Sequence, residues 1–64
     1  MYVVVYNVLV GEAVLPKDLL MKVWARDIKE AKERFLARFF NNNAEAIDAG
    51  HDIGVQVVAM VQYS

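Results

Sequence analysis

The residues best suited to chemistry lie close together in the segment DAGHD, residues 48–52. Asp48, His51 and Asp52 supply two carboxylates and an imidazole, which are donors that divalent metal ions accept. A metal centre needs further ligands from other parts of the chain, and His51 is the only histidine. We therefore interpret His51 and Asp52 as turn residues that lead into a strand, and we predict no metal site.

Groups for covalent catalysis are scarce throughout the sequence. There is no cysteine or threonine, and the only serine is Ser64. Nucleophilic catalysis needs a hydroxyl or thiol beside a general base, and the sequence offers no such pair. Gly11, Gly50 and Gly54 are too scattered to form a phosphate-binding loop. The sequence therefore predicts a protein that is not an enzyme and that carries no cofactor.

The opening stretch YVVVYNVLV, residues 2–10, contains no charged residue. Valine and tyrosine favour strands, and an apolar residue at nearly every position is typical of a strand covered on both faces. Gly11 ends this segment. Residues 12–18 contain Pro16, which cannot donate to a strand ladder, so we predict a loop or a frayed edge there.

Two further strands are predicted, over residues 19–25 and 54–63. In the first of them one row of alternating residues is wholly apolar and the other is mixed, which indicates a half-buried strand. The apolar row consists of Leu19, Met21, Val23 and Ala25. In the last strand the corresponding row consists of Val55, Val57, Ala59 and Val61. We expect both rows to face the helix.

A helix is predicted between these strands, over residues 28–40. Asp27 is placed to cap its N-terminus, with Glu30 three residues later as in a capping box. Glu30 and Arg34 form an i,i+4 ion pair in the favourable order. The apolar stripe consists of Ile28, Ala31, Phe35 and Phe39, with Leu36 and Phe40 to one side. The three asparagines at 41–43 end the helix, and residues 44–50 are compatible with one further short helical turn.

The element order β-β-α-β predicts a single α+β domain over residues 1–64. A helix that crosses between the second and third strands leaves the first strand in the middle, which gives an antiparallel sheet of order 2-1-3 with the helix on one face. A domain of 64 residues has a small core, yet 58% of its residues are hydrophobic. The surplus indicates a second subunit or a partner.

One helix covers one face of such a sheet, so the other face must be open. We expect the tyrosine row of the first strand, which contains Tyr2 and Tyr6, to lie there, because a phenol hydroxyl needs a partner or water. The candidate residues for a dimer or partner interface are Tyr2, Tyr6, Lys22, Trp24, Arg26, Val58 and Met60.

Three interpretations of this surface remain open. It could form a homodimer through the open face or a sheet edge, dock a different protein, or stack single-stranded or ribosomal nucleic acid on Trp24 and tyrosines beside Lys22 and Arg26. The net charge of −1 disfavours the last of these. We expect a non-enzymatic protein-binding module of the regulator or inhibitor type.

The sequence also predicts where such a module acts. The opening stretch lacks the basic region of a signal peptide and is too short to span a bilayer as a helix. The lack of cysteine gives no indication of an oxidising compartment. We therefore expect a cytoplasmic protein without a membrane partner. Small cysteine-free chains of this kind are common among viral (phage), mobile-element and ribosome-associated proteins.

Overall fold

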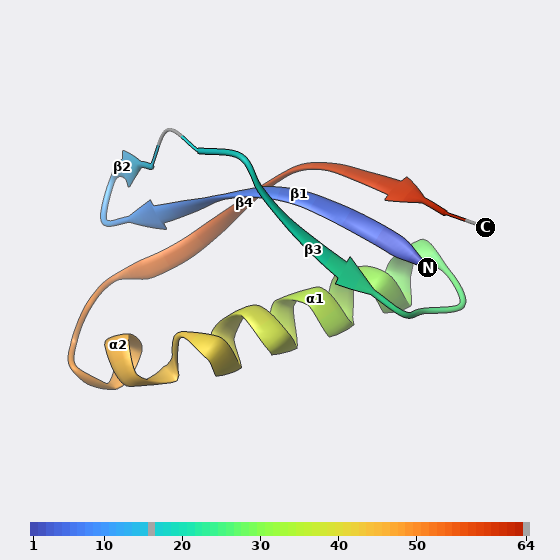
Figure 1. Ribbon diagram of the computed structural model, residues 1–64. Helices are drawn as coiled ribbons and strands as arrows, with labels where there is room; N and C mark the ends of the chain where they lie inside the picture. The colour runs from blue at the N-terminus through green and yellow to red at the C-terminus, as the bar shows by residue number, and fades with distance from the viewer. Residues whose placement is uncertain (16, 64) are drawn as a thin grey trace.

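The computed structural model describes residues 1–15 and 17–63. Its elements in chain order are β1 (Tyr2–Val10), β2 (Ala13–Val14), β3 (Leu19–Val23), α1 (Ile28–Asn42), α2 (Ala44–Asp48) and β4 (Ile53–Gln62). The strands form one antiparallel sheet, and α1 packs on one of its faces (Figure 1). This is the predicted α+β fold. The two-residue strand β2 was not predicted, and it lies in the segment 12–18 that was predicted as a loop or frayed edge. Pro16 of that segment is outside the described part of the chain.

Strand β1 lies in the middle of the sheet. β4 pairs with β1 along its whole length, from Tyr2↔Gln62 to Val10↔Ile53. β3 and β2 therefore share the opposite edge of β1, where β3 pairs with residues 2–6 and β2 with Leu9 and Val10. The predicted order, with the first long strand between the other two, is confirmed.

A tight turn and one polar side chain hold β2 and β3 against β1. Gly11 adopts a φ of 61°, a conformation that favours glycine, in the turn between β1 and β2. With its amide turned so that the nitrogen faces these acceptors, the Asn7 side chain can donate to the Lys17 carbonyl and to the Asp18 carboxylate, both at 2.9 Å. Asn7, the only polar residue of β1, therefore fixes the connection that leads into β3.

Helix α1 begins as its sequence predicts. The Asp27 side chain accepts a hydrogen bond of 2.8 Å from the backbone N–H of Glu30. The reciprocal bond is displaced by one residue, because the Glu30 carboxylate accepts from the N–H of Arg26 rather than from Asp27. Gly50, with a φ of 92°, follows the short helix α2.

The core lies between α1 and the tyrosine row of β1. Val4, Ala31 and Phe35 are fully buried, and Tyr2, Tyr6, Val23 and Phe39 are nearly so. The Tyr6 ring makes edge-on contacts with Phe35 and Phe39, with ring centroids 4.9 and 5.9 Å apart. Such pairs contribute about 0.5–1.5 kcal/mol each beyond their buried area.

The prediction that Tyr2 and Tyr6 lie on the open face is therefore wrong. It rested on the need of each hydroxyl for a partner. No buried side-chain oxygen or nitrogen of the described residues lacks a hydrogen bond, so burial of the two rings leaves no orphaned hydroxyl. The gain from packing the Tyr6 ring against Phe35 and Phe39 decides which row of β1 faces the helix.

Strand β4 contains an irregularity that changes which of its residues face the helix. The register shifts between Val5 and Tyr6 of β1, so that Val57 pairs with Tyr6 and Ala59 with Val5. An extra residue in one strand reverses the alternation beyond it. Val55 packs against the core as predicted, but so does Met60, which was predicted on the open face. Ala59 and Val61 lie on the open face instead of the predicted helix side.

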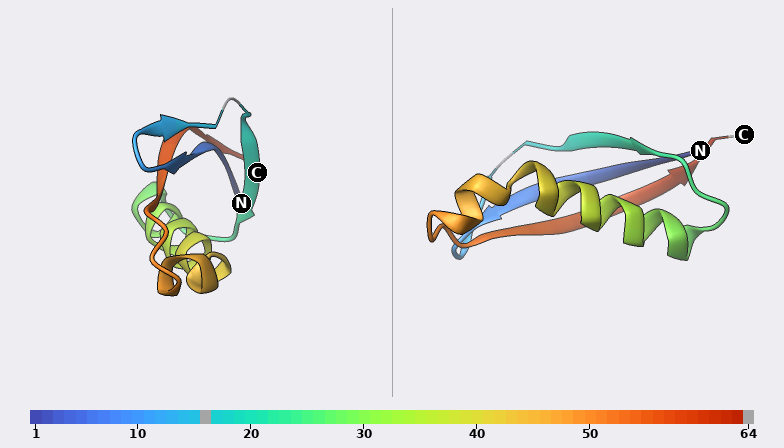
Figure 2. Two further views of the ribbon diagram at one scale, coloured as in Figure 1. Left: turned by 90° about the vertical axis from the view of Figure 1, so that its left-hand side faces the viewer. Right: turned by 90° about the horizontal axis from the view of Figure 1, so that it is seen from below.

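The helix stripe also differs from its prediction at one end. Ala31, Phe35 and Phe39 are buried, and Leu36 packs beside them, whereas Ile28 is 59% exposed. The helix lies along the strands and its first turn is at the end of the sheet where both chain termini lie (Figures 1 and 2). Periodicity predicts the direction of a side chain around a helix and leaves open how far along the helix the sheet extends.

Candidate binding surface

The sheet face opposite α1 is uncovered and mostly apolar. Strand pairing places Val3 opposite Lys22 and Val61, and Val5 opposite Leu20 and Ala59. Because side chains directly opposite each other in a sheet share a face, these residues form one surface. We call it the open face, and it consists of Met1, Val3, Val5, Leu20, Lys22, Ala59, Val61 and Tyr63.

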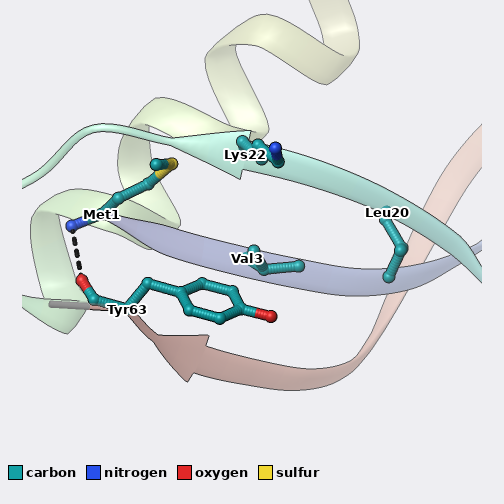
Figure 3. Close-up of a pocket in the computed structure, with 5 residues that line it drawn as sticks. All are labelled: Met1, Val3, Leu20, Lys22 and Tyr63. Carbon is teal, nitrogen blue, oxygen red and sulfur yellow. Dashed lines mark hydrogen bonds between the residues drawn. The ribbon is translucent and has the colours of Figure 1, made fainter.

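A shallow hollow of about 420 Å³ lies at one end of the open face. It is lined by Met1, Val3, Leu20, Lys22 and Tyr63, which come from the first and last residues of the chain and from β3 (Figure 3). The Tyr63 ring lies alongside Val3, and the Leu20 and Lys22 side chains stand on the neighbouring strand. The hollow therefore has apolar walls and one cation at its margin.

Backbone hydrogen bonds fix the position of Tyr63. Its N–H donates to the Met1 carbonyl at 2.6 Å, and the terminal amino group of Met1 donates to the Tyr63 carbonyl at 3.1 Å. These two bonds extend the β1–β4 ladder beyond the last strand residue. They hold the aromatic ring over Val3, which is only 8% exposed although it lies on the open face.

A second hollow, of about 260 Å³, lies at the outer edge of β3. It is lined by Val23, Trp24, Arg34 and Arg38. The Arg34 Nη1 donates to the Trp24 carbonyl at 2.7 Å, and the Arg38 Nη1 donates to the Lys22 carbonyl at 3.0 Å. Trp24 is 70% exposed, and it lines this hollow together with the two arginines. The hollow therefore combines an exposed aromatic ring with two guanidinium groups. We call this site the Trp24 hollow.

Ion pairs along the helix surround Glu30. Its carboxylate lies 3.3 Å from Arg26 and 3.4 Å from Arg34, which includes the predicted i,i+4 pair. The pKa of Glu30 is lowered from its usual value, mainly because the carboxylate accepts the backbone N–H of Arg26. Desolvation of the carboxylate opposes this effect, and the side-chain bond from Arg26 and the charges of Arg34 and Arg26 lower the pKa further. The carboxylate is thus kept ionised beside the two arginines.

The structure separates the residues predicted to form one interface. Lys22 lies on the open face, and Trp24 belongs to the hollow at the β3 edge. Arg26 is exposed and paired with Glu30, since β3 ends at Val23 before reaching it. Val58 is exposed beside the register shift of β4. Tyr2, Tyr6 and Met60 are on the helix side, so the open face does not contain them.

Sequence reasoning missed Leu20, Val61 and Tyr63 as surface residues. Leu20 had a usable signal, because it alternates with Lys22 in the mixed row of the second strand. Val61 and Tyr63 had none, since their side of the sheet depends on the register shift in β4.

The segment DAGHD connects α2 to β4. The backbone N–H of His51 donates to the Ala46 carbonyl at 3.0 Å, and the Asp52 carbonyl accepts from Gly11 at 2.8 Å. Within residues 1–15 and 17–63, no three histidine or acidic side chains are grouped so that they could hold a metal ion. The interpretation of His51 and Asp52 as connecting residues before the last strand agrees with these contacts.

Comparisons with known proteins give no relative on which to base a function. No family model matches the chain, and neither the curated proteins nor the solved structures contain a significant match. In the described part of the chain, neither helix has the length and apolar character needed to cross a membrane.

Proposed function

We propose that this protein is a small non-enzymatic protein-binding module, of the regulator or inhibitor type, that docks a partner protein on the open face. One observation carries this proposal, namely the apolar hollow over Val3. A fixed aromatic ring, an exposed leucine and a single lysine are the kinds of group that protein interfaces use as an anchor site with a charged rim. The sequence contains no cysteine or threonine, which supports the proposal that the protein is not an enzyme.

The chemistry of the hollow indicates what the partner presents. A volume of about 420 Å³ accommodates one or two large apolar side chains. The Lys22 ammonium at its margin favours an acidic group beside that apolar anchor. We propose a partner segment in which an aromatic or aliphatic residue is flanked by aspartate or glutamate, bound in the cytoplasm.

The proposal is tested by affinity capture with two variants of the protein. Leu20→Glu places a negative charge in the wall of the hollow and leaves the core intact, because Leu20 is 67% exposed. Glu33→Gln, on the exposed side of α1, is the matched control. We expect a specific partner to be retained by the wild type and by Glu33→Gln and lost by Leu20→Glu. Retention of that partner by Leu20→Glu would contradict docking on the open face.

A second candidate function is supported by the Trp24 hollow. An exposed aromatic ring beside arginines is a platform on which a nucleic-acid base stacks while the cations neutralise phosphate. Binding of that kind weakens steeply with salt. Titration with labelled single-stranded oligonucleotides at about 50 and 200 mM salt tests it. Tight, salt-sensitive binding that Trp24→Ala abolishes would favour nucleic acid over a protein partner.

A further inference from the structure

The two edges of the sheet differ in what covers their free backbone groups. At the β3 edge, the carbonyls of Lys22 and Trp24 point away from β1 and accept from Arg38 and Arg34. These side chains reach across from α1 and occupy acceptors that another strand would need. Natural proteins protect edge strands with charged side chains in this way. The β3 edge is therefore partly closed to further strands.

The outer edge of β4 has no such protection. β4 is ten residues long, and IGVQVVAMVQ contains no charged residue and no proline. β1 is its only strand partner, and among residues 1–15 and 17–63 no side chain donates to or accepts from its backbone. A long, uncharged strand with one free edge is a template for pairing with a further strand.

The positions of the free backbone groups follow from the hydrogen-bond pattern. In an antiparallel ladder, bonded and non-bonded residue pairs alternate. Gly11 bonds to Asp52, so Ile53, Val55 and Val57 direct their N–H and C=O groups away from β1. This run of alternating donors and acceptors is self-complementary, because an antiparallel copy presents the same groups in reverse order.

Apolar side chains are exposed on the β4 side, and we call Val57 of β4 together with Leu36 and Phe40, on the flank of α1 away from β3, the apolar strip. Val57 is 37% exposed and Phe40 of α1 is 41% exposed. Leu36 is half-buried, with Arg34 and Arg38 on the opposite flank of the helix, towards β3. The β4 side of the molecule therefore combines unpaired backbone groups of β4 with exposed apolar side chains of β4 and α1.

We propose that the β4 edge pairs with the β4 edge of a second copy of this chain, antiparallel and about a two-fold axis perpendicular to the sheet. The two sheets then form one continuous sheet, and both α1 helices lie on the same face of it. Their Leu36 and Phe40 flanks approach each other across the axis, which covers the apolar strip. Closed two-fold dimers are the commonest oligomers, and each half of the interface is the same surface.

The size of this side of the molecule suits a stable dimer. The molecule measures 38 × 22 × 14 Å. The side formed by β4 and α1 runs along the longest axis in one direction and from the sheet to the helix in the other. The rectangle spanned by the 38 and 22 Å extents is roughly 840 Å², so an interface that covers most of this side would reach the roughly 800 Å² per partner that standard interfaces bury. The partly closed β3 edge disfavours the addition of further copies there, so we expect pairing to stop at two. The open face is left free, so the dimer is compatible with the proposed function and does not depend on it.

Molecular mass in solution tests the proposal, with proline variants at neighbouring positions of β4. Val57→Pro removes an outward N–H that the ladder with β1 does not use, whereas Gln56→Pro removes an inward N–H. We expect the wild type to have twice the 7.3 kDa chain mass at tens of micromolar. We expect Val57→Pro to have the single-chain mass with an unchanged circular dichroism spectrum, and Gln56→Pro to unfold. Leu20→Glu, on the open face, should remain dimeric.

Three results would overturn the proposal: a monomeric wild type, a folded Val57→Pro variant that stays dimeric, or loss of the dimer in Leu20→Glu alone. If Val57→Pro does not fold, disulfide cross-linking decides, because the chain has no native cysteine. A chain that carries both Val55→Cys and Val57→Cys should cross-link to a second chain under mild oxidation, because a two-fold axis at or between these positions brings 55 or 57 opposite 55 or 57 of the copy, and Leu20→Cys should not cross-link. The reverse pattern would show that the copies meet through their open faces.

Discussion

Replacement of Phe35 by alanine should leave the protein largely unfolded. Phe35 is fully buried, and its ring centroid lies 4.9 Å from that of Tyr6 and 6.1 Å from that of Phe39. Removing a buried phenylalanine costs about 3–5 kcal/mol through lost transfer energy and the cavity left behind. A domain of 64 residues has about 3–10 kcal/mol of stability in total, and a single small core usually supplies the lower part of that range. The loss is therefore comparable to the whole free energy of unfolding.

Urea and thermal denaturation followed by circular dichroism measure this loss. Ile28→Ala is the matched control, because Ile28 lies on the same predicted stripe but is 59% exposed. Its free energy of unfolding should change by less than about 0.5 kcal/mol. All variants must be compared at one protein concentration, since association adds to apparent stability. A cooperative melt for Phe35→Ala close to that of the wild type, or an equal loss in both variants, would refute the core described above.

Two further predictions concern a turn and an ion pair. Gly11→Ala should lower the free energy of unfolding by about 1–2 kcal/mol in urea titration, because alanine is strained at a φ of 61°. Gly54→Ala is the control and should leave the free energy of unfolding nearly unchanged, because its new Cβ would meet Leu9 at an ordinary 3.6 Å. Glu30→Gln should be less stable than the wild type at pH 7. The lowered pKa of Glu30 means that its contribution is present above the unfolded value near 4.5 and is lost as the pH falls through the folded value. Urea titrations at pH 7 and about pH 3 should therefore show a difference that shrinks on acidification, and a constant difference would contradict the role of the charge.

The sequence alone determines the local structure of this protein and the order of its main strands. Asp27 caps α1 because its carboxylate needs only the amides of the next turn, which are close to it in the chain. β1 is recognised as the central strand because apolar residues on both sides are typical of the middle of a sheet, although the structure leaves its Val3 and Val5 side uncovered. Such signals are contained in a few neighbouring residues, so they can be read without knowledge of the rest of the fold.

Tertiary structure alone decides which side of each strand faces the helix. Alternation in β1 gives two rows of residues, and either row could face the helix. Only the packing of Tyr6 against Phe35 and Phe39 decides between them. The register shift beside Val57 then reverses the alternation of the second half of β4. It moves Met60 into the core and Val61 to the open face. The candidate surface could therefore be foreseen as an uncovered sheet face. Its actual residues depend on contacts between segments far apart in the chain, such as Tyr63 over Val3, which no local pattern contains.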